Sequence, residues 1–264
     1  MNKIESIILQ NSARGMDVLK DHLSQTFCSD AANAILGWDR GTVLVTTGFY
    51  VAGHAETDGP PGALFVCNAL KHNGFTPVVI TDDICRGYFE EFGISVEYIS
   101  KNASDADFDR INKTFSPVGM ISIERCGENV RGDYANMRGI SIAEHTAPID
   151  RMFETAICPT VGIGDGGNEI GMGNLADVIR DKLSLCPCKT KVDYLVVATV
   201  SNWGALALGA AMGYLPSENE YLSAYEACVS HGYVDGISKE VTLSEDGFDL
   251  SVGKQLLNEL SQIK

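Results

Sequence analysis

Basic residues are scarce in this chain of 264 residues. Its 20 lysines and arginines stand against 35 aspartates and glutamates, and the formal net charge is −15. Proteins that bind nucleic acid need a basic surface that displaces counterions from the phosphates, and anionic membranes attract the same kind of surface. We therefore expect neither a nucleic acid nor a membrane as a partner.

Proline is also scarce, with 8 residues, while 45% of the residues are hydrophobic and 21% are charged. This composition is typical of a folded globular protein and excludes the disordered and collagen-like classes. A chain of this length can bury a sizeable core. Because no repeat, low-complexity tract or linker interrupts the sequence, we predict a single domain over residues 1–264.

Neither a targeting peptide nor a membrane-spanning helix is indicated. Residues 1–10 contain one lysine, one glutamate and a short apolar run, which matches neither a signal peptide nor an Arg-rich transit peptide. Residues 194–215 are apolar over a long stretch, but Ser201 and Asn202 interrupt them. A strand followed by a helix explains this segment better than a membrane span.

The eight cysteines do not suggest a disulfide framework. Cys67, Cys85 and Cys158 lie in apolar segments that have the pattern of core elements. Buried, reduced thiols are typical of a cytosolic protein. We therefore expect a cytoplasmic location.

Short β-branched runs alternate with longer segments of helical pattern. The predicted strands are residues 42–47, 77–81, 96–99, 119–123, 160–163 and 194–200. The predicted helices are part of 16–36, then 62–72, 85–92, 108–115, 149–156, 175–185 and 203–212. This alternation indicates an α/β fold with a mostly parallel sheet and helices on both faces, a Rossmann-like arrangement of three layers.

The C-terminal part of the chain has a different pattern. Residues 241–243 and 248–250 flank an Asp246-Gly247 turn, and a helix is predicted over residues 252–262. Asp-Gly between two apolar runs is a strong hairpin signal. We predict a hairpin and a helix that pack on the sheet as part of the same domain.

Four loops that follow predicted strands are rich in acids, arginines, amides and glycines. They are residues 48–62, 124–138, 164–173 and 201–204. In a parallel α/β sheet, ligands bind outside the carboxyl ends of the strands, where such loops converge. We therefore predict the functional site at this edge of the sheet.

Two cofactor classes are disfavoured. Residues 162–167 satisfy G-x-G-x-x-G, but Asp165 would place a carboxylate against the pyrophosphate, and no second strand ends in an acid about twenty residues further on. None of the four loops contains a lysine, which argues against a pyridoxal phosphate Schiff base. We expect no nucleotide and no pyridoxal phosphate.

The remaining chemistry is that of carboxylates and arginines acting on a small anionic substrate. Arginines such as Arg125 and Arg138 grip carboxylates bidentately. The amides of Gly166 and Gly167, at the start of an expected helix, are placed to face an oxyanion. Oxygen ligands from this edge, with Glu56 and Asp58 as the predicted metal ligands, suit a divalent ion such as Mn²⁺ or Mg²⁺.

Several motifs, in order along nearly the whole chain, resemble the D-glutamate cyclase family. They are ETDGPPGA at residues 56–63, ERCG at 124–127, YANMRG at 134–139, PID at 148–150, GIGDGGNEIGMG at 162–173 and SNWG at 201–204. The resemblance implies a hydro-lyase that cyclises D-glutamate to 5-oxo-D-proline with loss of water. It implies a small anionic amino acid as the partner of the site.

Loop position and residue type then give the expected roles. The predicted catalytic residues are Asp165, Glu169 and Glu124. The predicted substrate-binding residues are Arg125, Tyr134, Asn136, Arg138, Gly166, Gly167, Asn168, Ser201 and Asn202. Two other function classes stay open: a metal-dependent phosphatase or phosphosugar enzyme, which also uses acidic loops and helix N-termini, and a non-catalytic sensor of acidic amino acids. A homo-oligomer also stays open.

Overall fold

Six parallel strands form the central sheet of the computed structural model, which describes residues 3–263. In spatial order they are β5 (Ser95–Tyr98), β4 (Thr76–Thr81), β1 (Thr42–Thr46), β6 (Gly119–Ile123), β7 (Thr160–Gly164) and β8 (Tyr194–Val197). All six predicted strands are confirmed. Residues 1, 2 and 264 of the predicted domain lie outside the described residues.

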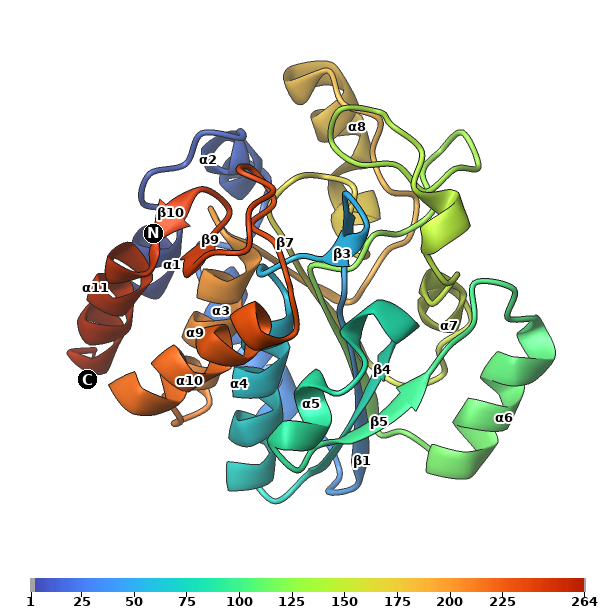
Figure 1. Cartoon of the computed structure of the whole chain (residues 1–264), viewed down its shortest axis with the longest axis horizontal. Helices are drawn as coiled ribbons and strands as arrows, with labels where there is room; N and C mark the ends of the chain where they lie inside the picture. The colour runs from blue at the N-terminus through green and yellow to red at the C-terminus, as the bar shows by residue number, and fades with distance from the viewer. Residues whose placement is uncertain (1–2, 264) are drawn as a thin grey trace.

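Both faces of the sheet are covered by helices. Helices α3 (Phe27–Leu36), α4 (Pro60–His72) and α9 (Ser201–Ala211) lie on one side, and α6 (Asp105–Phe115) and α7 (Asp150–Glu154) lie on the other (Figure 1). Every residue of β6 and β7 is buried, as expected for strands covered on both faces. The predicted three-layer α/β fold is confirmed.

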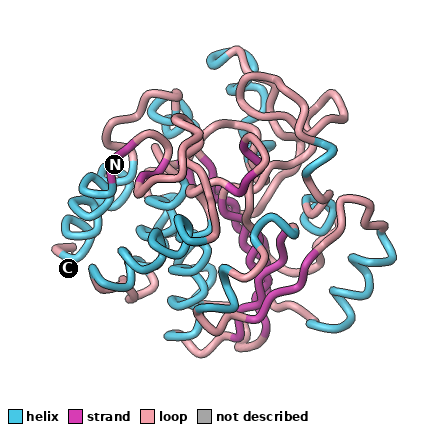
Figure 2. Tube along the Cα trace, viewed as in Figure 1, coloured by secondary structure: helices cyan, strands magenta, loops and turns pink. Residues whose placement is uncertain are grey.

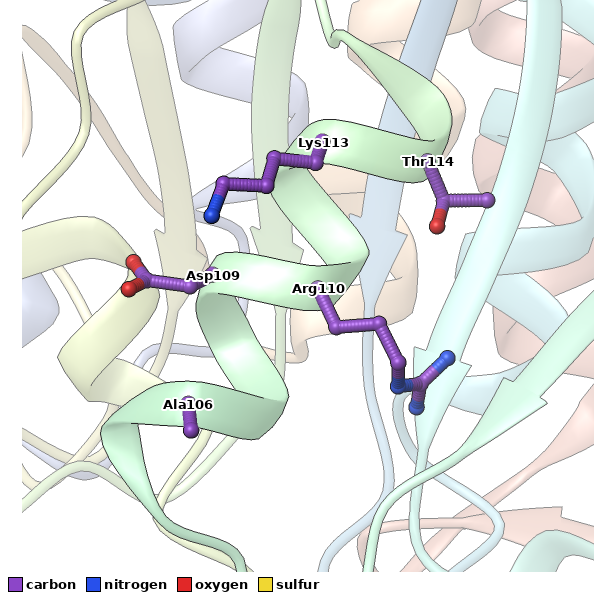
Figure 3. Close-up of a pocket in the computed structure, with 5 residues that line it drawn as sticks. All are labelled: Ala106, Asp109, Arg110, Lys113 and Thr114. Atoms are coloured by element: carbon purple, nitrogen blue, oxygen red, sulfur yellow. The ribbon is translucent and has the colours of Figure 1, made fainter.

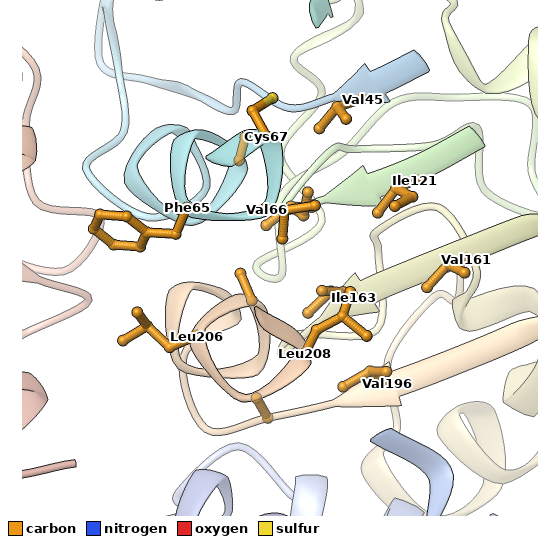
Figure 4. Packing of buried hydrophobic residues seen from close by; sticks show 14 of the residues in the cluster. Val45, Phe65, Val66, Cys67, Ile121, Val161, Ile163, Val196, Leu206 and Leu208 are labelled. Atoms are coloured by element: carbon orange, nitrogen blue, oxygen red, sulfur yellow. The ribbon is translucent and has the colours of Figure 1, made fainter. Parts of the chain in front are cut away.

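The core between the sheet and its first helix layer is built from aliphatic side chains. Val66 of α4 and Leu208 of α9 point toward the strands, where Ile121 and Ile163 meet them (Figure 4). The two helices also approach one another closely: a Cβ on Gly62 would lie 2.9 Å from the Cβ of Ala205. This close packing fixes the N-terminal ends of both helices beside the sheet edge.

The direction of winding changes between β1 and β6. The chain leaves β1 toward α4 on one face and leaves β6 toward α7 on the other, although the two strands are neighbours. In open α/β sheets, such a switch point opens a crevice at the carboxyl ends of the strands. Loops gather beyond this end of the sheet, where the small hairpin of β2 (Tyr50–Val51) and β3 (His54–Ala55) also lies (Figure 2).

The remaining elements are short or peripheral. They are α1 (Lys3–Ile8), α2 (Met16–Leu19), η1 (Lys20–His22), η2 (Asp83–Cys85), α5 (Tyr88–Glu91), η3 (Ala143–His145), η4 (Met172–Leu175), α8 (Ala176–Val178), η5 (Ile179–Leu183), α10 (Glu218–Ser230), β9 (Ser244–Glu245), β10 (Phe248–Asp249) and α11 (Leu250–Ser261). The helix predicted over residues 175–185 is broken into the 3₁₀ turn η4, the single turn α8 and the π-helical turn η5. Within residues 3–263, no helix has the length and apolarity needed to cross a bilayer.

The predicted C-terminal hairpin exists, but its first arm was placed wrongly. Asp246 (φ 52°) and Gly247 (φ 83°) form a two-residue turn, and this turn pairs Phe248 with Glu245. The first arm is therefore β9 at residues 244–245 and not residues 241–243. Helix α11 then packs against α1 and α9.

Candidate active site

Five carboxyl groups are buried together at the carboxyl edge of β1, β6 and β7. They belong to Glu56, Asp58, Glu124, Asp165 and Glu169, and none is more than 7% exposed. Each comes from a loop that follows one of these three strands at the switch point. We call these five residues the acid cluster.

Asp58 links the first of these loops to helix α9. Its carboxylate accepts hydrogen bonds from the backbone N–H groups of Gly59 (2.9 Å), Ser201 (2.9 Å) and Asn202 (2.7 Å). These donors favour the ionised carboxylate, whereas burial and the neighbouring Asp165 raise its pKa. The side chain is thus both a capping group for α9 and a member of the cluster.

Glu124 and Glu169 are also held by specific donors. Ser201 Oγ donates to Glu124 Oε2 at 2.6 Å, and Gly167 N donates to Glu169 Oε2 at 2.8 Å. Glu124 has a left-handed backbone (φ 45°), which is strained for a residue other than glycine. Backbone strain of this kind concentrates at functional sites.

An arginine that the sequence prediction missed neutralises part of this charge. Arg14 Nη2 lies 2.6 Å from Asp165 Oδ2, pairs with Asp246 and donates to Thr199 O at 3.1 Å. Arg14 comes from the loop before α2, and Asp246 from the turn of the C-terminal hairpin. Neither residue follows a strand of the sheet. The expectation that site residues lie in loops after strands therefore did not identify them.

Burial and mutual repulsion raise the pKa values of the carboxyl groups. The pKa of Glu56 rises to about 8 and that of Glu169 to about 7, in both cases because of desolvation first and the charge of Asp165 second. Arg14 acts in the opposite direction on both groups. The pKa values of these two groups are therefore close to neutral pH, the range that suits acid–base catalysis.

The carboxylates also form two sets that suit a hard cation. Asp58, Asp165 and Asp246 each offer one oxygen within 4.8 Å of the others, and so do Glu124, Asp165 and Glu169. Such all-oxygen sets fit Mg²⁺ or Mn²⁺. Of the predicted metal ligands, Asp58 belongs to the first set, whereas Glu56 belongs to neither.

A cavity of about 110 Å³ is lined by Gly166 and Asn168, which are the sequence neighbours of Asp165 and Glu169. Its lining residues come mainly from the loop after β6 and the loop after β7: Asn129, Arg131, Asp133, Ala135, Asn136, Met137, Gly139, Gly166, Asn168, Leu185 and Cys186. Met137 connects the two regions, because its sulfur lies 3.7 Å from Arg14 Nη1. A small polar ligand in this cavity would contact Asn136, Gly166 and Asn168, and none of the five carboxyl groups of the acid cluster lines it.

A second hollow lies on the surface of α6, away from these loops. Its lining residues, from Ala106 to Thr114, all belong to that one helix (Figure 3). Arg110 there pairs with Glu97 on β5. None of the loops that carry the acid cluster contributes to this hollow, so we assign it no part in the site.

A family model described as D-glutamate cyclase-like, C-terminal, matches residues 4–261. The chain belongs to the D-glutamate cyclase-like family. The human mitochondrial D-glutamate cyclase is 30% identical to it over an alignment of 211 residues that covers 67% of this chain and 33% of the human protein. The chain thus spans about a third of the length of this curated relative.

A solved structure of an exopolyphosphatase-related protein from Bacteroides fragilis is also similar. It matches with a TM-score of 0.41 and 10% sequence identity, over 90% of this chain and 56% of that protein. A match at this level carries no argument about the function of the D-glutamate cyclase-like chain.

Two residues predicted to bind substrate are engaged in the scaffold of this D-glutamate cyclase-like domain. Arg125 is fully buried, where it forms an ion pair with Asp82 (2.8 Å) and donates to Gly48 O (2.9 Å) and Ala147 O (2.6 Å). Asn202 Oδ1 accepts from Gly59 N and Gly62 N at the start of α4, and its Nδ2 donates to Thr57 O. Neither side chain lines the cavity.

Only some of the other residues predicted to bind substrate line the cavity. Asn136, Gly166 and Asn168 line the cavity. Tyr134 and Arg138 do not: the Tyr134 hydroxyl donates to Asp150 at 2.6 Å, and Arg138 is exposed. Ser201 is bound to Glu124, as described above.

The expectation that Gly166 and Gly167 begin a helix is wrong. The next helical element, η4, begins only at Met172, because Glu169 folds back and accepts the Gly167 N–H. That amide is therefore occupied and is not free to bind an oxyanion.

Proposed function

We propose that this protein cyclises D-glutamate to 5-oxo-D-proline with loss of water. Family membership supports the reaction class, and the site supports the chemistry. The observation that carries the proposal is the pair of buried carboxyl groups, Glu169 and Glu56, in one acid cluster, whose pKa values of about 7 and about 8 lie at and just above neutral pH.

The reaction places specific demands on the protein. An amide bond forms between the α-nitrogen and the side-chain carboxyl carbon of glutamate, and one carbon–oxygen bond of that carboxyl group breaks. The two protons that the ammonium group loses leave with the oxygen as water. The protein therefore needs groups that move protons and hold the chain curled, but no net proton source and no ATP.

The acid cluster meets these demands. Glu169 in its ionised form takes a proton from the ammonium group, since its pKa of about 7 makes it a base near neutral pH. Glu56, with a pKa of about 8, is protonated at the same pH and donates toward the departing oxygen. A divalent ion held by Asp58, Asp165 and Asp246, when bound, would polarise the substrate carboxylate.

Cationic side chains hold the substrate. Arg131 lines the cavity and is placed to bind the α-carboxylate. Arg14 offsets the negative charge of the cluster, because its guanidinium lies against Asp165. Without such cations the anionic substrate would be repelled by the carboxylates.

Proton NMR of the purified protein with D-glutamate, and separately with L-glutamate, tests the proposal. We expect 5-oxoproline from the D enantiomer only, and loss of turnover in Asp165→Asn but not in the matched surface variant Asp181→Asn. Repeating the assay after EDTA treatment tests the oxygen-ligand sets. Release of phosphate from phosphorylated metabolites, or tight binding of D-glutamate with no conversion, would instead support the phosphatase or sensor class.

A further inference from the structure

The carboxyl group of Glu56 lies against the backbone of Gly236, in the segment that leads from α10 to the C-terminal hairpin. A Cβ on Gly236 would overlap Glu56 Oε1 and would lie 2.7 Å from its Cδ and 3.5 Å from its Cγ. Two atoms cannot share this space in a close-packed interior. The carboxyl group therefore occupies the place that a side chain at residue 236 would take.

The backbone conformation does not require glycine at residue 236. Gly232 and Gly247, on either side of it along the chain, have φ angles of 73° and 83°, in the left-handed region that favours glycine. Gly236 is not among the residues with a positive φ. The missing side chain of Gly236 therefore makes room for Glu56 and does not serve the path of the chain.

Backbone hydrogen bonds tie the chain around Glu56 to the chain before Gly236. Thr57 N donates to Val234 O at 2.9 Å, and Val234 N donates to Ala55 O at 3.0 Å. These two bonds form a short parallel bridge between Glu56 and Val234. The two backbones cannot separate without breaking them, so the contact between the carboxyl group and Gly236 is held in place.

Asp235 fixes the chain next to Gly236. This residue is fully buried, and its carboxylate accepts four hydrogen bonds. The donors are Ile237 N (3.0 Å), Ser238 N (2.8 Å), Ser244 Oγ (2.8 Å) and Gly247 N (2.7 Å). Burial raises the pKa of Asp235, but these donors outweigh it and lower the pKa overall, so the carboxylate is ionised. Gly236 is therefore part of a rigid segment.

We propose that Gly236 is a positioning residue, whose bare backbone sets where the Glu56 carboxyl group lies within the acid cluster. The inference rests on the proposed function, in which Glu56 donates a proton toward the departing oxygen. A glutamate side chain has several staggered conformations, and an acid must lie within hydrogen-bond reach of the group that it protonates. Gly236 acts through Glu56 alone, by excluding the conformations in which the carboxyl group would move away.

The charges around Glu56 give a measure of its position that does not depend on catalysis. Desolvation and the charges of Asp165, Asp235 and Glu169 raise the pKa of Glu56, whereas the charge of Arg14 lowers it. A displaced carboxyl group changes its burial and its distance from each of these charges. Its titration midpoint therefore reports the displacement directly.

Gly236→Ala tests the inference, because it adds the Cβ and removes no hydrogen-bonding group. In assays with D-glutamate across the pH range, we expect kcat to fall at least tenfold and KM to change less than threefold. The basic limb of the profile should move, and the acidic limb should stay. Gly41→Ala is the matched control: its Cβ would lie 2.7 Å from Val118 Cγ1, before β1 at the opposite end of the sheet. We expect it to retain both limbs.

Carbon NMR titration of the Glu56 carboxyl signal, identified by its loss in Glu56→Gln, measures the displacement. We expect the midpoint to shift by at least one pH unit in Gly236→Ala and to stay unchanged in Gly41→Ala. An unchanged midpoint in Gly236→Ala, with both limbs of the rate profile in place, would overturn the inference. A shifted midpoint in a protein whose wild type does not convert D-glutamate would support the contact and contradict only the proposed function.

Thermal unfolding decides the case in which Gly236→Ala fails to fold. The comparison is then between Glu56→Ala and the double variant that also carries Gly236→Ala. Without the Glu56 carboxyl group the added Cβ has room, so we expect the two proteins to unfold at the same temperature. A double variant that unfolds at a lower temperature than Glu56→Ala would show that Gly236 is needed for another reason, and would overturn the inference.

Discussion

Arg14 Nη2 lies 2.6 Å from Asp165 Oδ2, although the two residues are 151 positions apart. The same guanidinium pairs with Asp246 in the C-terminal hairpin. The loop before α2 and the hairpin thus meet over the loop that follows β7. The charge balance of the acid cluster depends on both ends of the fold as well as on the sheet.

Removal of this guanidinium should destabilise the protein. Loss of one partner from a buried ion pair costs about 3–5 kcal/mol, and we expect roughly 2–4 kcal/mol for Arg14→Gln, whose side chain is 22% exposed. Urea unfolding at pH 8 measures the loss. In the control Arg110→Gln, the lost ion pair with Glu97 is exposed, and we expect a change within about 0.5 kcal/mol. Equal losses in the two variants would show that Arg14 does not stabilise the cluster.

The raised pKa of Glu56 predicts how stability depends on pH. Because the pKa is about 8 in the folded protein against an ordinary 4.5, the folded state binds more protons between these values, and stability falls as the pH rises from 4.5 to 8. Glu56→Gln removes this dependence. At about 1.4 kcal/mol per pKa unit, we expect the variant to gain on the order of 2–4 kcal/mol relative to wild type between pH 5 and pH 8.

The measurement is the free energy of unfolding at both pH values. Glu226→Gln, exposed on α10, is the matched control and should leave the wild-type slope unchanged. A Glu56→Gln variant that keeps the wild-type slope would mean that Glu56 is already ionised in the folded protein at pH 5.

The strands could be predicted from the sequence because strands buried on both faces have nearly continuous apolar runs, as in GMISI of β6. The convergence of Asp58, Glu124 and Asp165 also followed, since parallel strands bring their carboxyl ends to one edge. Helix α10 was missed although Ser217 and Glu220 form a capping box, because its hydrophobic face is weakly patterned.

The direction in which each side chain points could not be predicted from its position in the sequence. Arg125 and Asn202 follow strands as substrate ligands would, but they satisfy carbonyl and amide groups of neighbouring loops. Arg14 and Asp246 follow no strand of the sheet and reach the site only through tertiary packing. Polar side chains that pair with free backbone groups are not available to a ligand. The sequence alone does not indicate which backbone groups are left unpaired.

Asn202 should therefore act on stability more than on substrate binding. Asn202→Ala removes the hydrogen-bond partner of the Gly62 N–H group and of the Thr57 carbonyl, whereas Gly59 N–H keeps Asp58 as its acceptor. At about 1–3 kcal/mol for a buried unsatisfied group, we expect roughly 2–4 kcal/mol of destabilisation. We expect the KM for D-glutamate to change less than threefold in the folded fraction. Asn219→Ala, exposed on α10, is the control for stability. A KM raised more than tenfold with unchanged stability would restore Asn202 as a substrate ligand.

Glu169 should determine the acidic limb of the pH–rate profile. Glu169, with a pKa of about 7, acts as the base, and Glu56, with a pKa of about 8, acts as the acid. We therefore expect a bell-shaped dependence of kcat/KM on pH, with its maximum between these two values. Glu169→Gln keeps the shape of the side chain but cannot accept a proton, so we expect a loss of about 10²–10⁴-fold and the disappearance of the acidic limb.

The shape of the profile separates this role from a structural one. A change that only disturbed packing would lower kcat/KM at every pH and would leave the two limbs of the profile near pH 7 and pH 8. Glu128→Gln is the matched control, since Glu128 pairs with Lys189 outside the cluster, and it should retain both limbs. If the acidic limb persists in Glu169→Gln, the base is another member of the acid cluster, and Asp165→Asn becomes the variant whose profile has to change.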